Sequence, residues 1–106
     1  MNIYWLSLFF AGLLEIIWAF FMKQSAGFTK IIPSIITITT MIGSFFLLAF
    51  SMKNIPLSTA YVIWTGIGAI GSFIVGIYLL GDSVNSIKII AAIFILIGII
   101  LMKASS

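Results

Sequence analysis

The chain contains no cysteine and no histidine, and only two of its 106 residues are acidic. The absence of cysteine excludes disulfides and thiol chemistry, and the two absences together remove the usual ligands of soft metals. The sequence also lacks a nucleophile paired with a base and a phosphate-binding glycine sequence placed in a loop. These absences argue against an enzyme, and we expect no cofactor.

Charge of either sign is scarce, whereas 63% of the residues are hydrophobic and the mean hydropathy is +1.37. Four apolar runs cover residues 3–22, 31–50, 57–80 and 87–102. As helices they are long enough, or nearly so, to cross about 30 Å of hydrocarbon. The joints between them are short and contain turn-forming residues, which favours antiparallel neighbours. The sequence therefore predicts an all-α integral membrane protein with one domain, residues 1–106, of four transmembrane helices.

The five lysines lie at the ends of these runs. This placement is typical of anchoring at lipid headgroups, and a nucleic-acid patch would need the lysines clustered on one face. We therefore expect a lipid bilayer, and no nucleic acid, as the partner of this surface.

Glu15 is the one acidic residue inside an apolar run, near the middle of the first. An ionised carboxylate at the bilayer centre costs about 2.5–3.5 kcal/mol on insertion scales, so such residues usually face a bundle interior or a water-filled path. Glu15 is the default candidate for binding a proton, a cation, or each in turn. Trp18 follows one turn later on the same face and has an indole N–H that can donate to the carboxylate.

Three further residues are candidates for the same site. Ser44 lies in a weakly polar stripe of the second run with Thr37 and Thr40, whose hydroxyls either orient a carboxylate or bond back to their own helix. Tyr61 and Trp64 share a face of the third run, where they either wall a cation site or serve as packing and interfacial anchors.

Small residues mark the last two runs. Residues 66–71 spell a dinucleotide-binding fingerprint, but they lie inside an apolar span with no preceding strand, so the match is false. Gly66 and Gly68 instead indicate a flexible or closely packed helix segment. Ala91 and Gly98 lie seven residues apart in the fourth run and predict a weak helix-packing seam.

The lysines divide almost evenly between the two membrane sides that four spans define. Lys53 and Lys103 lie on one side, and Lys23, Lys30 and Lys88 on the other. This near-tie gives the positive-inside rule little to act on, so the chain either inserts in both orientations or has one weakly specified topology. Dual insertion would supply the inverted repeat that secondary transporters commonly use and that this chain lacks.

Together these residues resemble the small multidrug resistance family of proton-coupled exporters over essentially the whole chain. The similarity is carried by AGLLEIIWA around Glu15, MKQSAGFTKIIPS across the first joint, GSFFLL around Ser44, and IPLSTAYVIWTGIGA across residues 55–69. The resemblance implies an antiparallel, dual-topology homodimer in a bacterial inner membrane, whose first-helix glutamate binds protons and cationic substrate alternately.

The resemblance also implies roles for individual residues. It assigns the alternating site to Glu15, substrate-site roles to Tyr61 and Trp64, support of the glutamate to Ser44, and a helix bend to Gly66 and Gly68. It places the dimer-packing motif of the fourth helix at Ala91 and Gly98, although the family usually has glycine at the first of these. Lys30 is a second mild departure, since arginine is usual there.

Within the family, the chain looks most like the guanidinium exporters, because Trp18 follows Glu15 by three residues and Met41 precedes Ser44 by three. The polyaromatic-drug exporters typically have a small residue and a tyrosine at these two positions. We therefore expect proton-coupled antiport that exports guanidinium or related small guanidinyl cations. Export of quaternary ammonium or aromatic cations by the same machinery is the alternative, and a non-transporting membrane protein is a third possibility.

Overall fold

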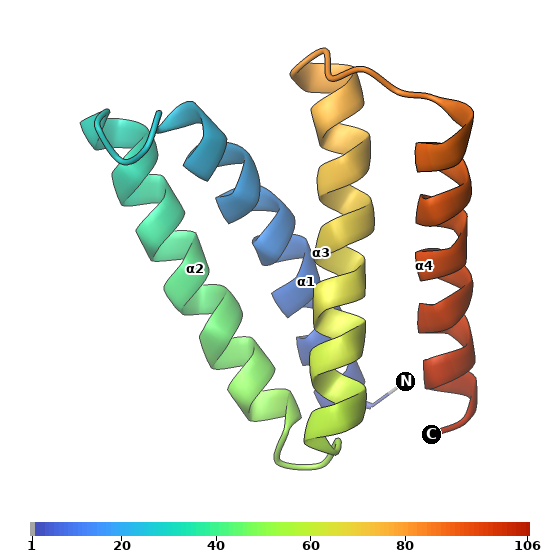
Figure 1. The fold of residues 1–106 in the computed structure, drawn as a ribbon. Coiled ribbons are helices and arrows are strands. Elements are labelled where there is room, and N and C mark those ends of the chain that lie inside the picture. Colours follow the sequence, from blue (N-terminus) through green and yellow to red (C-terminus); the bar gives the residue numbers. More distant parts are fainter. Residues whose placement is uncertain (1) are drawn as a thin grey trace.

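The structure is a computed structural model that describes residues 2–106. It contains four helices, α1 (Ile3–Gln24), α2 (Ile31–Ser51), α3 (Leu57–Leu79) and α4 (Ser86–Ala104). Consecutive helices run in opposite directions, so α1 begins and α4 ends at the same end of the bundle (Figure 1). Each is long and apolar enough to cross a membrane. The prediction of an all-helical protein with four apolar spans is confirmed.

Local interactions explain where the helices begin and end relative to the apolar runs. The fourth helix begins at Ser86, one residue before its run, because the Asn85 side chain caps it by accepting the N–H of Lys88 at 2.9 Å. The third helix ends at Leu79, because the chain reverses at Gly81, whose φ of +70° suits glycine. Hydropathy cannot locate these ends, since they depend on backbone groups.

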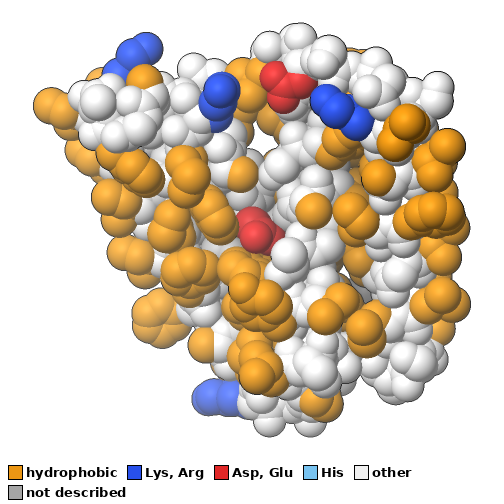
Figure 2. Space-filling view, in the orientation of Figure 1, with side chains coloured by type: hydrophobic (Ala, Val, Ile, Leu, Met, Phe, Trp, Pro, Cys, Tyr) orange, Lys and Arg blue, Asp and Glu red, His pale blue; other side chains and the backbone are white. Residues whose placement is uncertain are grey.

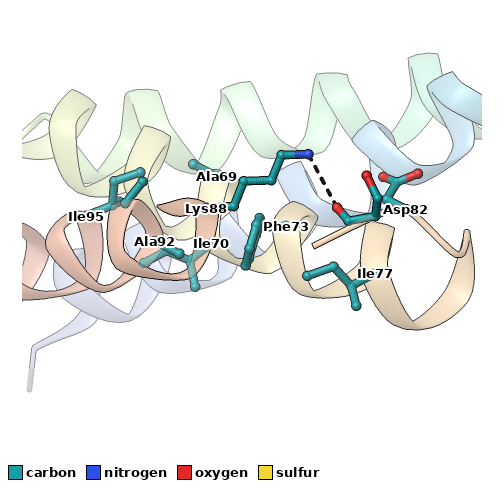
Figure 3. Close-up of a pocket in the computed structure, with 10 residues that line it drawn as sticks. Ala69, Ile70, Phe73, Ile77, Asp82, Lys88, Ala92 and Ile95 are labelled. Atoms are coloured by element: carbon teal, nitrogen blue, oxygen red, sulfur yellow. Dashed lines mark hydrogen bonds between the residues drawn. The ribbon is translucent and has the colours of Figure 1, made fainter. Parts of the chain in front are cut away.

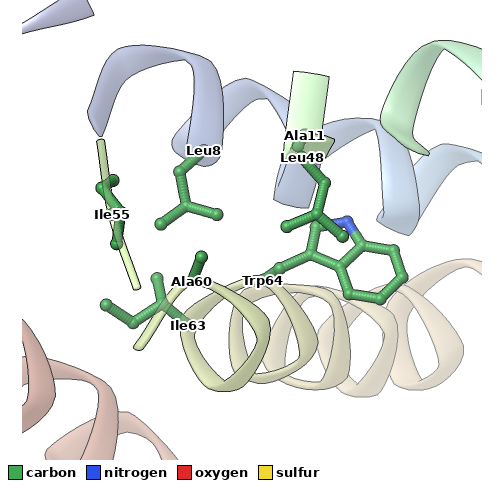
Figure 4. Packing of buried hydrophobic residues seen from close by; sticks show 7 residues of the cluster. All are labelled: Leu8, Ala11, Leu48, Ile55, Ala60, Ile63 and Trp64. Carbon is green, nitrogen blue, oxygen red and sulfur yellow. The ribbon is translucent and has the colours of Figure 1, made fainter. Parts of the chain in front are cut away.

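The core lies among α1, α2 and α3. Helix α1 packs against both α2 and α3, whereas α4 packs mainly against α3. The buried hydrophobic side chains come from these first three helices and the joint before α3, and α4 contributes none (Figure 4): Leu8, Ala11, Leu48, Ile55, Ala60, Ile63 and Trp64. The fourth helix is therefore almost entirely exposed in the single chain, with most of its apolar surface unpartnered.

Helix α4 approaches the rest of the chain most closely near its C-terminal half. Gly66 of α3 faces Ile99, and a Cβ at Gly66 would lie 2.6 Å from the Ile99 side chain, so the glycine allows close approach of α3 and α4. At the end of α4, the Lys103 ammonium lies over the Trp5 ring, 4.2 Å from its centroid. Helix α3 is continuous through Gly66 and Gly68. Both glycines lie in close contact with side chains of neighbouring helices.

Hydrophobic side chains cover the middle of the molecule, and lysines lie at its two ends (Figure 2). Exposed Ile, Leu and Phe side chains occur on every helix. Such a surface is unsuitable for water but matches a hydrocarbon solvent with charged groups at its boundaries.

Candidate functional site

Glu15 lies in the middle of α1 and faces the backbone of α3. A Cβ built on Gly68 would overlap the Glu15 carboxylate, so the absence of a side chain at Gly68 makes the space that the carboxylate occupies. In the space-filling view, an acidic group lies at mid-height among hydrophobic side chains, far from the lysines at the two ends (Figure 2). The carboxylate is thus positioned at the level where charge is least tolerated.

Two polar atoms at this level have no hydrogen-bond partner within residues 2–106. They are Glu15 Oε1 and Trp18 Nε1, both buried. An acceptor and a donor are therefore left open one helical turn apart, although buried polar atoms are normally paired. The hydrogen bond expected from Trp18 to Glu15 is not formed. The Trp18 ring instead meets the Phe45 ring edge to face, with centroids 6.4 Å apart.

Ser44 connects three helices but does not bind Glu15 directly. Its hydroxyl donates to the carbonyl of Ala11 at 2.7 Å and accepts the Trp64 indole N–H at 3.0 Å. Ala11 lies one turn before Glu15 on α1, so this bond fixes the helix segment that carries the carboxylate. Ser44 is fully buried and Trp64 nearly so, which protects both bonds from competing water.

The other hydroxyls of the polar stripe bond to their own helix. Thr37 donates to the carbonyl of Pro33 at 2.7 Å, and Thr40 donates to that of Ile36 at 2.7 Å. The second of the two interpretations of this stripe is therefore confirmed for Thr37 and Thr40. Ser44 alone reaches across to another helix.

Four aromatic rings form a row that begins at Trp18, one helical turn after Glu15. Successive centroids are 6.4 Å apart from Trp18 to Phe45, 5.7 Å from Phe45 to Trp64, and 5.4 Å from Trp64 to Tyr61. Phe45 was not among the predicted site residues, because it follows Ser44 directly and nothing in the sequence of α2 marks its face. Phe45 and Tyr61 are about half exposed, so the row offers π-faces outside the single-chain core.

Ala91 and Gly98 lie apart from these residues. Both are exposed on α4, and a Cβ at Gly98 would meet nothing within 4 Å among the described residues. The small side chains therefore do not form a seam inside the single chain.

We expect Ser44→Ala to destabilise the fold more than a matched change in the same helix. The substitution leaves the Trp64 N–H without its acceptor and removes the link to α1. We expect a loss of about 1 kcal/mol, within the range measured for hydrogen bonds between membrane helices. Thr37→Val is the control, since Thr37 is equally buried but bonds only to its own helix. Unfolding in mixed detergents measures both, and equal losses would contradict the connecting role.

Four apolar helices that carry one intramembrane carboxylate and a row of aromatic rings define a multi-pass helical membrane protein with a polar site inside its bundle. The family model described as Small Multidrug Resistance protein matches residues 3–97. The chain belongs to this family, as its sequence predicts, and is a multi-pass transport protein of the bacterial inner membrane.

Individual relatives match almost end to end. A protein of Yersinia pseudotuberculosis serotype I (strain IP32953), named Guanidinium exporter, is 52% identical over 102 residues, which are 96% of this chain and 98% of the relative. Proteins with the same name from Escherichia coli (strain K12) and Proteus vulgaris are 49% and 50% identical over 102 residues, covering 96% of this chain and 97% and 98% of the relatives.

Proposed function

We propose that the chain exports guanidinium or related small guanidinyl cations in exchange for protons. The observation that carries this proposal is the buried, unpaired Glu15 oxygen at the middle of a membrane span, in a chain about half identical to proteins named guanidinium exporter. A guanidinium ion is planar, and its N–H groups meet carboxylate oxygens two at a time. It therefore supplies both the charge and the hydrogen bonds that Glu15 lacks.

The surrounding residues have complementary roles in this proposal. Glu15 binds a proton and the cation alternately, and Trp18 donates its open indole N–H to the Glu15 carboxylate when the cation is bound. Ser44 supports the glutamate by holding the Ala11 segment of α1, and it orients Trp64 through their hydrogen bond. Tyr61 and Trp64 form a π-face for the cation.

Alternating access would follow from an antiparallel homodimer. One chain has no inverted repeat, and a second copy inserted in the opposite direction provides it. The exposed face of α4, which carries Ala91 and Gly98, suits close packing with another helix. Gly66 and Gly68 would let α3 bend as the two copies exchange conformations.

Charge balance couples the two fluxes. Two Glu15 carboxylates brought together in a dimer are costly to keep ionised, and either protons or a guanidinium ion relieves that cost. The site therefore releases the cation when protons arrive and releases protons when the cation arrives. Coupling requires that the empty, doubly charged site does not readily change sides, and an inward proton gradient then drives cation export.

Export of quaternary ammonium or aromatic cations is the second candidate. The row of aromatic rings favours it, because Phe45 and Tyr61 expose π-faces that hold cations without hydrogen bonds. The open acceptor at Glu15 favours guanidinium, since a tetraalkylammonium ion has no N–H to pair with a carboxylate.

Transport by purified protein in vesicles distinguishes the candidates. A proton gradient should drive concentrative uptake of guanidinium far faster than that of a tetraalkylammonium ion at equal concentration. Preference for the tetraalkylammonium ion would support the second candidate. Failure to move either ion against its gradient would refute proton-coupled antiport.

Substitutions at Trp18 should separate its volume from its hydrogen-bond donor. Trp18→Gly should weaken guanidinium transport and admit bulkier cations, because it removes the N–H and opens space beside Glu15. Trp18→Phe should weaken guanidinium transport without admitting bulkier cations, because the ring remains. Losing a hydrogen bond to a charged group costs about 1.5–3 kcal/mol, so KM should rise at least tenfold in both. Unchanged guanidinium transport would show that Trp18 only packs.

A further inference from the structure

A cavity lies between α1 and α3, beyond Glu15 toward the end of the molecule that carries the first and third joints. Its volume is about 230 Å³, and its inner end is Ile16, the residue after Glu15. Its outer end holds Lys23 of α1 and Asp82, which follows α3. Lys23 lies seven positions after Ile16 on α1, so the groove runs for about 10 Å along this helix.

Asp82 is folded back over this groove by two glycines. Gly81 reverses the chain with a φ of +70°, and the Asp82 backbone N–H then donates to the carbonyl of Gly76 at 2.9 Å. A Cβ at Gly76 would lie 2.5 Å from Asp82 Oδ2, so the carboxylate rests where a side chain at position 76 would be. The turn uses only the Asp82 backbone, and its side-chain charge is free for another role.

Within residues 2–106, no lysine forms an ion pair with the Asp82 carboxylate. Lys88 lies on the other side of Asp82, in a neighbouring cavity between α3 and α4, and its ammonium donates to the carbonyl of Ser83 at 3.3 Å (Figure 3). This end of the molecule carries Lys23, Lys30 and Lys88, which repel an approaching cation, and Asp82 is its one acid. The groove is also smaller than the roughly 300–1,000 Å³ of sites for drug-sized ligands, so it suits a small cation.

We propose that the groove between α1 and α3 is a second binding position for a small guanidinyl cation on its way to or from Glu15, with the Asp82 carboxylate as its ligand. This inference rests on the proposed function. Asp82 holds the cation among the lysines, and the Ser72 hydroxyl lines the route between Asp82 and Ile16. In an antiparallel dimer, each membrane side would present one such groove.

Transport kinetics in vesicles test the groove. Asp82→Asn keeps the shape and backbone bond of the turn but removes the charge. We expect it to raise the guanidinium KM about threefold, the size of effect an exposed ion pair gives, with the maximal rate unchanged. Asp82→Glu should stay near the wild type. An unchanged KM in Asp82→Asn, with the wild type active, would overturn the groove and leave the proposed function standing.

Two double variants separate a local ligand from a diffuse charge effect. Asp82→Asn with Lys30→Gln restores the net charge of this end without touching the groove, and its KM should remain raised. A return to the wild-type KM would overturn the proposal.

Gly76→Ala should raise KM as Asp82→Ala does, because it displaces the carboxylate, and the combined variant should have a KM no higher than that of Asp82→Ala alone. Additive losses would show that the carboxylate does not act from its place over Gly76.

Binding can also be measured without transport. In a Glu15→Gln background, titration with guanidinium should shift the backbone amide NMR signals of Gly76 and Gly81 in a saturable manner. The shifts should disappear when Asp82→Asn is added. Their absence in the Glu15→Gln protein would overturn the groove, whereas failure of the proposed function alone would leave them intact.

Discussion

Glu15→Gln is expected to abolish proton-driven guanidinium exchange while the protein still inserts and assembles. The amide has nearly the shape of the carboxylate and fits the space beside Gly68, but it carries no charge to exchange between a proton and a cation. The variant also removes the cost of an ionised group at mid-membrane, so its helices should be at least as stable as those of the wild type. Guanidinium uptake into vesicles under a proton gradient measures the loss.

Glu15→Asp is the matched control for this variant. It keeps an ionisable carboxylate but shortens its reach toward Trp18, so it should still bind guanidinium and transport with a shifted pH profile. Normal proton-driven transport by Glu15→Gln would refute the exchange mechanism. Loss of transport in both variants with normal guanidinium binding would place the defect in the conformational step instead.

The helices could be predicted from sequence because lipid leaves the backbone few choices. Each peptide group inside the hydrocarbon must be paired within its own segment, so an apolar run of sufficient length forms a helix. The ends depend on single residues instead. Asn85 starts α4 by capping it, and Gly81 ends α3 by adopting a positive φ. Hydropathy contains neither signal.

The position of Glu15 was predictable, but its neighbours were only partly so. A carboxylate in an apolar run is conspicuous in any sequence, and Trp18 shares its helical face. The contact with Gly68 and the bond from Ser44 to the Ala11 carbonyl depend on how α1 meets α2 and α3. Residues far apart in the sequence make these contacts, and helical periodicity alone cannot pair them.

Phe45 and Asp82 show two other limits of sequence reasoning. Phe45 joins Trp18 of α1 to Trp64 of α3, and this position between two rings depends on how the three helices pack. Asp82 has the sequence of an ordinary loop acid, and it enters the groove because Gly76 and Gly81 together fold it back. The position of Phe45 depends on contacts with other helices, and that of Asp82 depends on two glycines, so neither residue is marked by its own sequence neighbours.

The exposed surface of α4 gives a structural reason to expect a second copy. Helix α4 packs mainly against α3 and has no buried residue in the single chain. Lipid covers apolar surface as well as another helix does, so exposure by itself does not demand a partner. The small residues Ala91 and Gly98 would let a second helix approach the α4 backbone closely, and lipid cannot provide this close packing. The direction in which each copy inserts into the membrane then decides whether the two copies are parallel or inverted.

Fixing the orientation should separate the two halves of an antiparallel dimer. Asn54→Lys with Ser106→Lys adds two positive charges to the side of Lys53 and Lys103, and Thr29→Lys with Val84→Lys adds two to the other side. Because the lysine counts are nearly tied, two charges should be enough to set each topology. All four positions are exposed.

Each locked form should lose export alone, and co-expression of the two should restore it. Only the mixture can place one Glu15 from each direction around a common site with inverted repeats on either side. The control introduces glutamine, in place of the added lysine, at the same four positions. It changes the side chains without biasing insertion, so these variants should remain active. Growth in toxic concentrations of guanidinium reports export, and reporter fusions at the C-terminus report orientation. Full transport by a single locked orientation would refute the antiparallel dimer, and the near-tie of lysines would then carry no functional information.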